Sequence, residues 1–400
     1  MSVDIVEKEK IEKVKWRVVK LKNLVEIIGG GTPSKSNPNY YQGDIPWASV
    51  RDLKYHKLYE TEFKITNDAV ENSSTNIIPK GNIIIATRVG LGKVVYNEID
   101  TAINQDLKGL IISEKIERNY LFYYFLCNAK FIERSGTGAT VKGVKLKFIK
   151  ELDVPLPPPD EQRLIVQKLD RLFAEIDAGI ALIDQNIAKA EALKLSVLDE
   201  EFSVGNGEWK EEKLKNLIQK TKNKKPKKEF GAQNFTYLDI SSINKETKEI
   251  EEPKTIKGLD APSRAKRAVQ KGDVLFATTR PNLKNVAIIK EDYDKPIAST
   301  GFSVLRVLSE RLINSYLFYY LIGEKLQDDI LPFIRGAQYP AISDRNLKNL
   351  KIPIPGVKEQ QKIVQKLDAL FTEMDSLVLE YNQKRENLEA LKSSLLDRAF

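Results

Sequence analysis

The sequence predicts two similar α/β domains, each followed by a long helix, in a chain with pseudo-two-fold internal symmetry. Three observations predict this fold. The chain has 400 residues, more than one ordinary domain holds. Its two halves carry the same motifs in the same order. Each half ends in a proline-free stretch whose apolar residues are spaced three and four apart, which is typical of a long amphipathic helix.

Composition excludes several classes of protein. Apolar residues make up 42% and charged residues 30%, so the chain can bury cores and is not a disordered polymer. The net charge of +8 favours a polyanionic partner such as nucleic acid. One cysteine and one histidine exclude an intrachain disulfide and a Cys/His zinc cluster. Cys127 follows an aromatic run and is predicted to be a small buried residue, and His56 a solvated loop residue.

The N-terminal residues 1–15 alternate acids and lysines and contain no apolar core of a signal peptide. No stretch approaches the roughly 20 apolar residues that cross a membrane. We therefore expect a cytoplasmic protein, with which a lone free thiol agrees.

The internal repeat is the strongest signal. Each motif recurs about 195 residues later, without change of order. The paired motifs are Trp16 and Trp209, Leu21–Leu24 and Leu214–Leu217, Lys80-Gly81 and Lys271-Gly272, Tyr120–Tyr124 and Tyr316–Tyr320, and Ile165–Asp170 and Ile363–Asp368. The period is too long for a solenoid, so we infer one duplicated module.

Each module begins with a mixed pattern. Residues 82–86 and 273–277 are short apolar runs after a Lys-Gly turn and are predicted to be buried strands. Residues 117–133 and 310–328 are predicted to be helices with an aromatic face. This mixture predicts an α/β domain.

Each module ends in a predicted long helix. Asp160 can cap a helix whose first turn carries Glu161 and which meets no proline before Phe202. The second copy follows Pro353–Gly356. The apolar stripes that we expect to form the contact are Ile165, Leu169, Leu172, Ile176, Ile180, Ile183 and Ile187, and then Ile363, Leu367, Leu370, Met374, Leu377, Leu388, Leu391 and Leu395.

The simplest arrangement pairs the two helices with each other as an antiparallel coiled coil, each about 60 Å long at about 1.5 Å per residue. In the alternative arrangement, each helix folds back on its own domain. The predicted segments are a first domain at 1–155, a first helix at 156–203, a second domain at 204–353 and a second helix at 354–400.

No catalytic or metal-binding signature is present in the sequence. There is no phosphate-binding loop, and the glycines at 29–31 and 90–92 do not open a dinucleotide-binding helix. Asn37–Tyr40 is similar to the tetrapeptide with which amino-methyltransferases hold a flipped base, but asparagine stands at its third position and no glycine-rich cofactor loop precedes it. A turn is the better interpretation.

Basic and polar residues interleaved with aromatics are the candidate DNA contacts, because such side chains hold phosphates and read base edges. For any single lysine a solvated surface position is the simpler explanation, and the clusters favour nucleic acid. In the first module the candidates are Lys35, Ser36, Asn37, Tyr40, Tyr41, Trp47, Arg51, Arg88, Lys142 and Lys145. In the second they are Lys222, Lys224, Lys225, Lys227, Lys228, Arg264, Lys266, Arg267, Arg280, Asn282, Lys284, Arg335, Gln338 and Tyr339.

Three motifs resemble one family. Gly30–Ser34 through Asn37–Tyr40 to Gly43–Trp47 is similar to the opening of the target-recognition domain in specificity subunits of type I restriction–modification enzymes. Asp153–Gln162 and Leu350–Gln360 are similar to that family's junctions into its conserved helices. The second domain departs from the opening pattern, with Tyr237–Ser242 where the first has Ile45–Ser49. In this family such divergence implies two different half-sites.

The resemblance implies a division of labour. Each domain would read one half of a bipartite, asymmetric target in double-stranded DNA, and the paired helices would fix the unread spacer. The chain would be non-catalytic, would bind no cofactor or metal, and would dock two methyltransferase subunits and, in the full complex, two restriction subunits. Those partners would hold S-adenosylmethionine, ATP and Mg, and the complex would cleave unmodified DNA as a defence against phage.

Two other interpretations remain open at this level. The chain can be a non-catalytic, two-headed coiled-coil adaptor that binds proteins only, which salt-sensitive DNA binding would exclude. It can also be a self-sufficient DNA methyltransferase, an interpretation that cofactor binding by the isolated chain would support.

Overall fold

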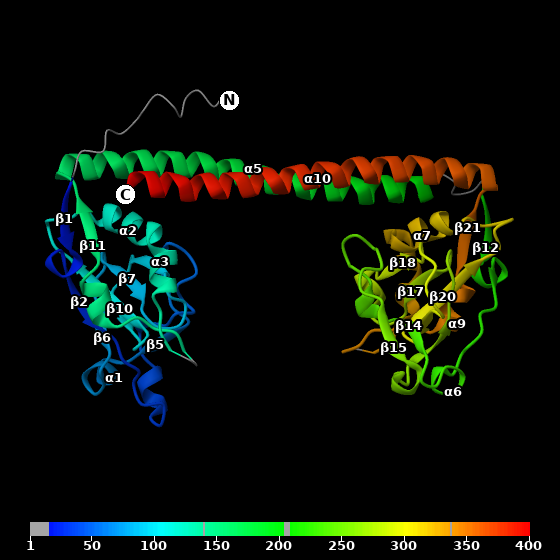
Figure 1. Cartoon of the computed structure of the whole chain (residues 1–400), viewed down its shortest axis with the longest axis horizontal. Coiled ribbons are helices and arrows are strands. Elements are labelled where there is room, and N and C mark those ends of the chain that lie inside the picture. The colour runs from blue at the N-terminus through cyan, green and yellow to red at the C-terminus, as the bar shows by residue number, and fades with distance from the viewer. Residues whose placement is uncertain (1–15, 139–140, 204–208, 337) are drawn as a thin grey trace. The chain divides into compact units, whose positions relative to one another are not determined.

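The computed structural model describes residues 16–138, 141–203, 209–336 and 338–400 (Figure 1). The predicted charge-alternating stretch 1–15 lies outside these residues, as does the start of the predicted second domain. The chain forms two compact units: unit 1 extends to Leu182 and includes Lys384–Phe400, and unit 2 is Ile183–Gln383. Each unit therefore combines one globular domain with parts of both long helices. Within the described residues, no helix is long and apolar enough to cross a membrane.

Unit 1 contains two mixed sheets and a two-stranded ribbon. In the ribbon, β1 (Arg17–Lys20) pairs antiparallel with β11 (Asp153–Leu156). The first sheet has the order β2 (Val25–Gly29), β10 (Leu107–Ile112), β7 (Ile83–Ala86), β8 (Val94–Asn97) and β4 (Lys57–Leu58). The second has the order β5 (Phe63–Ile65), β3 (Ile45–Ala48), β9 (Thr101–Ile103) and β6 (Asn76–Ile78), in which β3 and β9 are parallel.

The core of unit 1 lies between its first sheet and an aromatic helix. All four residues of β7 are buried, which accounts for its uninterrupted apolar sequence. Helix α2 (Arg118–Cys127) buries Tyr120 to Phe125 and lies between that sheet and the long helices (Figure 1). The remaining short helices are α1 (Asn67–Glu71), α3 (Ala129–Arg134) and α4 (Leu146–Lys150).

Unit 2 repeats this topology. Its ribbon is β12 (Lys210–Lys213) with β21 (Lys351–Ile354). Its first sheet is β13 (Ile218–Gln219), β20 (Phe302–Val307), β17 (Val274–Ala277) and β18 (Val286–Ile288). Its second is β15 (Lys254–Lys257), β14 (Asn234–Leu238), β19 (Ile297–Ser299) and β16 (Ala265–Ala268), with β14 and β19 parallel. Its short helices are α6 (Pro226–Glu229), α7 (Asn314–Ile322), α8 (Glu324–Ile330) and α9 (Asp344–Asn349). The predicted duplication is thus present in every strand except β4, which has no counterpart among the described residues of unit 2.

The two predicted aromatic helices are each interrupted, so their predicted extents were wrong. In unit 1 the break falls at Asn128, whose side-chain amide donates to the Tyr124 carbonyl at 2.9 Å and ends α2. In unit 2 it falls at Gly323, and α7 begins only at Asn314. Asparagine and glycine both favour helix ends, and the aromatic periodicity hid these signals.

The two long helices are confirmed. They are α5 (Pro159–Ser203) and α10 (Val357–Ala399), within three residues of the predicted limits. They pair antiparallel within each unit. In unit 1 Lys392 forms an ion pair with Asp177 at 2.6 Å. In unit 2 Lys194 pairs with Asp375, and Lys366 pairs with Glu201. Residues later in α5 therefore pair with residues earlier in α10, as antiparallel helices require.

The predicted stripe residues differ in burial. Ile165, Leu169, Ile176, Ile183, Ile363 and Leu367 are buried. Leu391 is 38% exposed. The other members, Leu172, Ile180, Ile187, Leu370, Met374, Leu377, Leu388 and Leu395, are half-buried. The buried members concentrate where a helix also packs on a domain.

Candidate nucleic-acid interface

In unit 1, three strand ends meet at one edge. In unit 1 the Asn104 N–H after β9 donates to the Ala48 carbonyl at the end of β3, at 3.0 Å. The Thr87 N–H after β7 donates to the Asp106 carbonyl at 2.9 Å. In unit 2 the matching bond runs from the Thr278 N–H to the Gly301 carbonyl at 2.8 Å. These loops form what we call the recognition edge of each unit.

The Asn37–Tyr40 motif forms a turn, as predicted. The Asn37 side chain caps the 3₁₀ turn Pro38–Tyr41, accepting the Asn39 N–H at 3.3 Å. The Tyr41 hydroxyl donates to the Pro33 carbonyl at 2.7 Å, and the half-buried Tyr41 ring lies edge-on to Trp47. Burial raises the pKa of Tyr41. Trp47 is 7% exposed and its indole donates to the Gly31 carbonyl at 3.2 Å, so it positions this loop from inside the unit.

Most of the candidate residues of unit 1 keep exposed side chains. Lys35, Ser36 and Arg51 are exposed, and Tyr40 is half-buried. Arg88 is also exposed, but its guanidinium lies 3.6 Å from the Asp106 carboxylate.

A hairpin docks beside Arg88. Its base is closed by two backbone hydrogen bonds between Thr137 and Gly143, each 2.9 Å long. The Val144 N–H ties it to the Thr87 carbonyl at 2.9 Å. Lys142 and Lys145 are exposed on and after this hairpin. The structure thus brings Arg88 and Lys142 to the same edge.

In unit 2, two basic clusters that are far apart in the sequence lie side by side. The Lys224 N–H donates to the Lys266 carbonyl at 2.7 Å, and the Ala268 N–H to the Lys222 carbonyl at 3.0 Å. Lys222, Lys225, Lys227, Lys228, Arg264 and Lys266 are exposed.

Two cations of these clusters are partly engaged within the protein. Lys224 is half-buried and lies 2.7 Å from Glu229, whose pKa this hydrogen bond lowers. Arg267 is half-buried, and its Nε has no hydrogen-bond partner among the described residues. Both side chains are therefore less open to a ligand than the exposed lysines of the same clusters.

The second cluster continues into the loop after β17. The Thr300 N–H donates to the Arg264 carbonyl at 2.8 Å, next to Gly301. Arg280 and Asn282 are exposed, whereas Lys284 is half-buried and pairs with Glu324 at 2.7 Å. Lys284 is thus drawn away from the edge.

A second hairpin docks on this loop. Arg335 and Ala341 exchange backbone hydrogen bonds of 3.0 and 2.9 Å, and the Ile342 N–H donates to the Thr278 carbonyl at 2.9 Å. Arg335, Gln338 and Tyr339 are exposed, although Arg335 donates to the Pro332 and Ile334 carbonyls. The Arg280 guanidinium lies over the Tyr339 ring, 5.1 Å from its centroid.

Sequence reasoning missed the residues that hold these edges together. Thr87 and Thr278 each end a buried strand, and each hydroxyl also donates across the edge. Asn104 and Asp106 belong to a polar run directly after β9. A polar run that follows an apolar strand was the available signal.

A buried glutamine joins each domain to its long helix. Gln162 is 1% exposed; it donates to the Pro157 carbonyl at 2.8 Å and accepts the Glu117 N–H at 2.7 Å. Gln360 is fully buried and accepts the Ile313 N–H at 2.9 Å. It donates to the Pro355 and Arg311 carbonyls, both at 2.9 Å. Such satisfied buried amides fix the helix origin against the domain.

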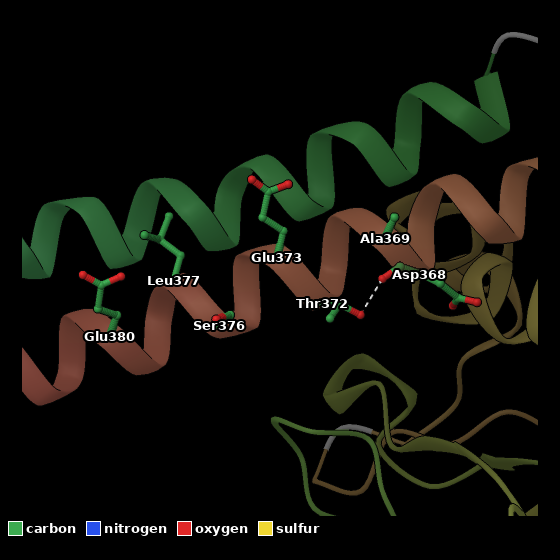
Figure 2. A pocket seen from close by; sticks show the side chains of 7 residues that line it. All are labelled: Asp368, Ala369, Thr372, Glu373, Ser376, Leu377 and Glu380. Carbon is green, nitrogen blue, oxygen red and sulfur yellow. Dashed lines mark hydrogen bonds between the residues drawn. The ribbon is translucent and has the colours of Figure 1, made fainter.

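A different surface lies on α10. It carries a shallow groove of about 630 Å³, lined by Asp368, Ala369, Thr372, Glu373, Ser376, Leu377 and Glu380. Figure 2 shows these side chains along α10. Asp368 accepts the Tyr319 hydroxyl at 2.6 Å. Three carboxylates and one leucine suit a protein partner better than a polyanion.

The single cysteine and the single histidine of the sequence, Cys127 and His56, each contact another side chain. Cys127 is half-buried with its Sγ 3.7 Å from an Asp397 carboxylate oxygen, and burial raises the pKa of its thiol to about 11. His56 is exposed as a whole residue, but its ring lies edge-on to Phe122, with the two ring centroids 5.3 Å apart. This partial burial of the imidazole lowers its pKa. Within the described residues, no three His, Cys, Asp or Glu side chains could together hold a metal ion.

Comparison with known proteins gives a consistent result. A family profile described as the type I restriction modification DNA specificity domain matches twice, at residues 13–185 and 206–387. The MjaIX specificity subunit of a type I restriction enzyme from Methanocaldococcus jannaschii is 23% identical, over 96% of this chain and 92% of its own length. The EcoR124I/EcoR124II specificity subunit of Escherichia coli is 33% identical over 40% of this chain and 41% of its own.

One solved structure matches the whole fold. It comes from work on complex assembly and conformational transition of the type I R-M system. It is 19% identical, has a TM-score of 0.76, and the match covers 98% of both chains. The topology described above is therefore that of a known architecture.

Proposed function

The chain belongs to the family of type I restriction–modification DNA specificity subunits, which determine the recognition sequence of their complexes, and we propose that its two domains read two different half-sites. We take these target-recognition domains as residues 1–155 and 204–353. The two domains share one backbone arrangement at the recognition edge but carry different side chains on it, and this difference supports the proposal. In unit 1 a hydrogen bond joins the residue after β7 to Asp106, in the loop before β10. The same bond in unit 2 joins the residue after β17 to Gly301, in the loop before β20, so an acidic residue in one unit corresponds to a glycine in the other.

A single chain with two diverged domains suits an asymmetric target. A two-fold homodimer presents identical surfaces and reads a palindrome. Here the lysines of residues 220–228 have one counterpart, Lys35, in the matching segment of unit 1. The two domains therefore offer DNA different contacts.

The long helices act in this proposal as a ruler and a docking platform. The glutamines Gln162 and Gln360 fix each domain on the first turn of its helix, so helix length sets the unread spacer. The acidic groove on α10 is open to a protein partner (Figure 2). We assign two methyltransferase subunits to the helices and two restriction subunits to the full complex, which acts in the cytoplasm.

Chemistry belongs to the partners in this proposal. The chain itself is non-catalytic and holds no cofactor. S-adenosylmethionine is assigned to the methyltransferases, and ATP with Mg to the restriction subunits.

Methylation mapping tests the proposal. The full chain, expressed with its cognate methyltransferase in a host without adenine methylation, should produce a split motif methylated once in each half. The motif should vanish when this chain is omitted. A soluble complex that adds no methylation, together with salt-insensitive DNA binding, would instead establish the protein-only adaptor.

Helix length gives a separate test of the ruler. Shortening α5 and α10 together by one turn should change the accepted spacer and leave both half-sites intact. Altered half-site bases with the original spacer would show that the helices do not measure distance.

A further inference from the structure

The loop after β17 holds two cations in an unusual backbone conformation. Arg280 has φ 51° and Lys284 has φ 48°, the left-handed region that non-glycine residues seldom adopt. They flank the 3₁₀ turn Pro281–Leu283. Such conformations persist where the surroundings enforce them, and they concentrate at binding sites.

Neighbouring backbone groups enforce the Arg280 conformation. Its N–H donates to the Pro340 carbonyl at 2.6 Å, and its carbonyl accepts the Leu283 N–H at 2.9 Å. The first bond comes from the docked hairpin, which Thr278 and Ile342 also anchor. The two loops therefore form one rigid support for the Arg280 side chain.

The hairpin also orients the guanidinium. Tyr339 is 66% exposed and its ring lies beneath Arg280, 5.1 Å from the guanidinium carbon. Stacking of this kind holds the planar cation by cation–π attraction and leaves its N–H edges open to hydrogen bonding. Among the residues that the structure describes, no carboxylate pairs with Arg280 as Asp106 pairs with Arg88, and Gly301 takes the place of Asp106 in the strand-exit bond.

We propose that Arg280, stacked on Tyr339, is a specificity-determining residue that reads a guanine in the half-site of the second domain. This rests on the proposed function above. A guanidinium presenting two parallel donors matches the O6 and N7 acceptors of guanine in the major groove, a pairing worth about 1–3 kcal/mol against a wrong base, or roughly 5- to 150-fold. Tyr339 is a positioning residue, since it limits the freedom that Arg280 would lose on binding.

The test compares variants of the full chain in complex with its methyltransferase. The readout is the methylated motif together with duplex affinity. Arg280→Ala should make one guanine of the second half-site degenerate, lowering its discrimination by roughly 5- to 150-fold, and should leave the first half-site unchanged. Tyr339→Ala should weaken preference at that same position, and Tyr339→Phe, which keeps the ring, should restore it.

Arg311→Ala is the matched control. It removes the same charge from the same unit, but Arg311 pairs with Glu212 beside the ribbon β12–β21. It should leave the motif and the affinity intact. Thermal unfolding identifies any variant that has lost its fold. If Arg280→Ala does not fold, Arg280→Lys replaces it in the test, because lysine keeps the positive charge but lacks the two parallel donors of the guanidinium, and it should show the same loss of guanine preference.

The outcomes separate this inference from the proposed function. A wild-type complex that yields no split motif contradicts the proposed function. A wild-type split motif combined with an unchanged base preference in Arg280→Ala overturns the inference alone, and a uniform loss of affinity would make Arg280 a phosphate contact. Degeneracy at a position other than guanine overturns the base assignment.

Discussion

The two recognition edges share a backbone frame and differ in charge. Residues 30–44 between β2 and β3 contain one lysine, whereas residues 220–233 between β13 and β14 contain six. Arg88 lies 3.6 Å from a carboxylate in unit 1, whereas Arg280 lies on an aromatic ring in unit 2. Duplication thus preserved the order of the strands that the two units share and one strand-exit bond, while divergence changed the side chains at this edge.

The largest expected difference lies in how each helix end completes a domain core. Phe202 is 2% exposed between Tyr316 and Tyr320, whereas Phe400 is half-buried against Tyr120 and Tyr124. Phe202→Ala should cost unit 2 about 3–5 kcal/mol through the cavity that it leaves. Phe400→Ala should cost unit 1 about half of that.

Hydrogen exchange resolved by peptide measures each unit in the same molecule. Protection should fall first in α7 for Phe202→Ala and in α2 for Phe400→Ala. Equal losses would show that the two helix ends stabilise their domains alike.

The next prediction concerns salt. Replacing Lys224, Lys225, Lys227 and Lys228 by alanine should weaken DNA binding uniformly across sequences, by about a hundredfold near physiological salt. The salt slope should fall by about three, because each phosphate contact adds about 0.9 and Lys224 already shares its charge with Glu229. Binding isotherms over a salt series measure both quantities.

Lys35→Ala is the corresponding change in unit 1. It should reduce the salt slope by less than one. An unchanged slope in the quadruple variant would make its lysines solvated residues with no role in binding.

Much of this architecture could be predicted from the sequence, because each pattern occurs twice and the second copy supports the interpretation of the first. The long helices followed from proline-free stripes, and the buried β7 and β17 from short apolar runs after Lys-Gly turns. Asn128 and Gly323 were missed as helix breaks because the aromatic residues around them continue the helical spacing. Here local capping overrode the periodicity.

The candidate interface was less predictable, because it is made by contacts between distant segments. Composition marked Lys222–Lys228 and Arg264–Arg267 as basic, but only the pairing of Lys224 with Lys266 shows that they are neighbours. Nothing in the sequence distinguished Arg88 from Arg280. Their difference depends on Asp106, Gly301 and Tyr339, which tertiary structure brings to them.

A smaller effect should follow from removing the acid that holds Arg88. Asp106→Ala frees the guanidinium and removes a negative charge from the unit 1 edge. Since an exposed ion pair is worth at most about 1 kcal/mol, DNA affinity should rise about three- to fivefold. The gain should disappear in the double variant Asp106→Ala/Arg88→Ala, measured by the same isotherms. Weaker binding by the single variant would mean that the Asp106 carboxylate supports the edge through the hydrogen bond that it accepts from the Asn104 amide.

The smallest expected effect concerns two equivalent aspartates, near the C-terminal ends of α5 and α10. Asp199 accepts the Glu324 N–H at 3.0 Å and caps α8, whereas its counterpart Asp397 lies beside Cys127. Burial and then this carboxylate raise the pKa of the Cys127 thiol from 9.0 to about 11. The folded chain thus keeps its proton where the unfolded chain loses it, so this contribution to stability is complete below pH 9 and is lost as the pH rises towards 11.

At pH 8 the native thiol should therefore react with iodoacetamide about a hundredfold more slowly than the thiol of the denatured chain. The two pKa values differ by about two units, so the thiolate fractions differ by about a hundredfold. Asp397→Asn should recover a small part of that rate, since burial is the larger cause. Mass spectrometry of the peptide containing Cys127 follows the reaction. Equal native and denatured rates would show that the folded chain does not shield the Cys127 thiol. The end of α10 would then lack, in unit 1, a close contact like the one that Asp199 makes with α8 in unit 2.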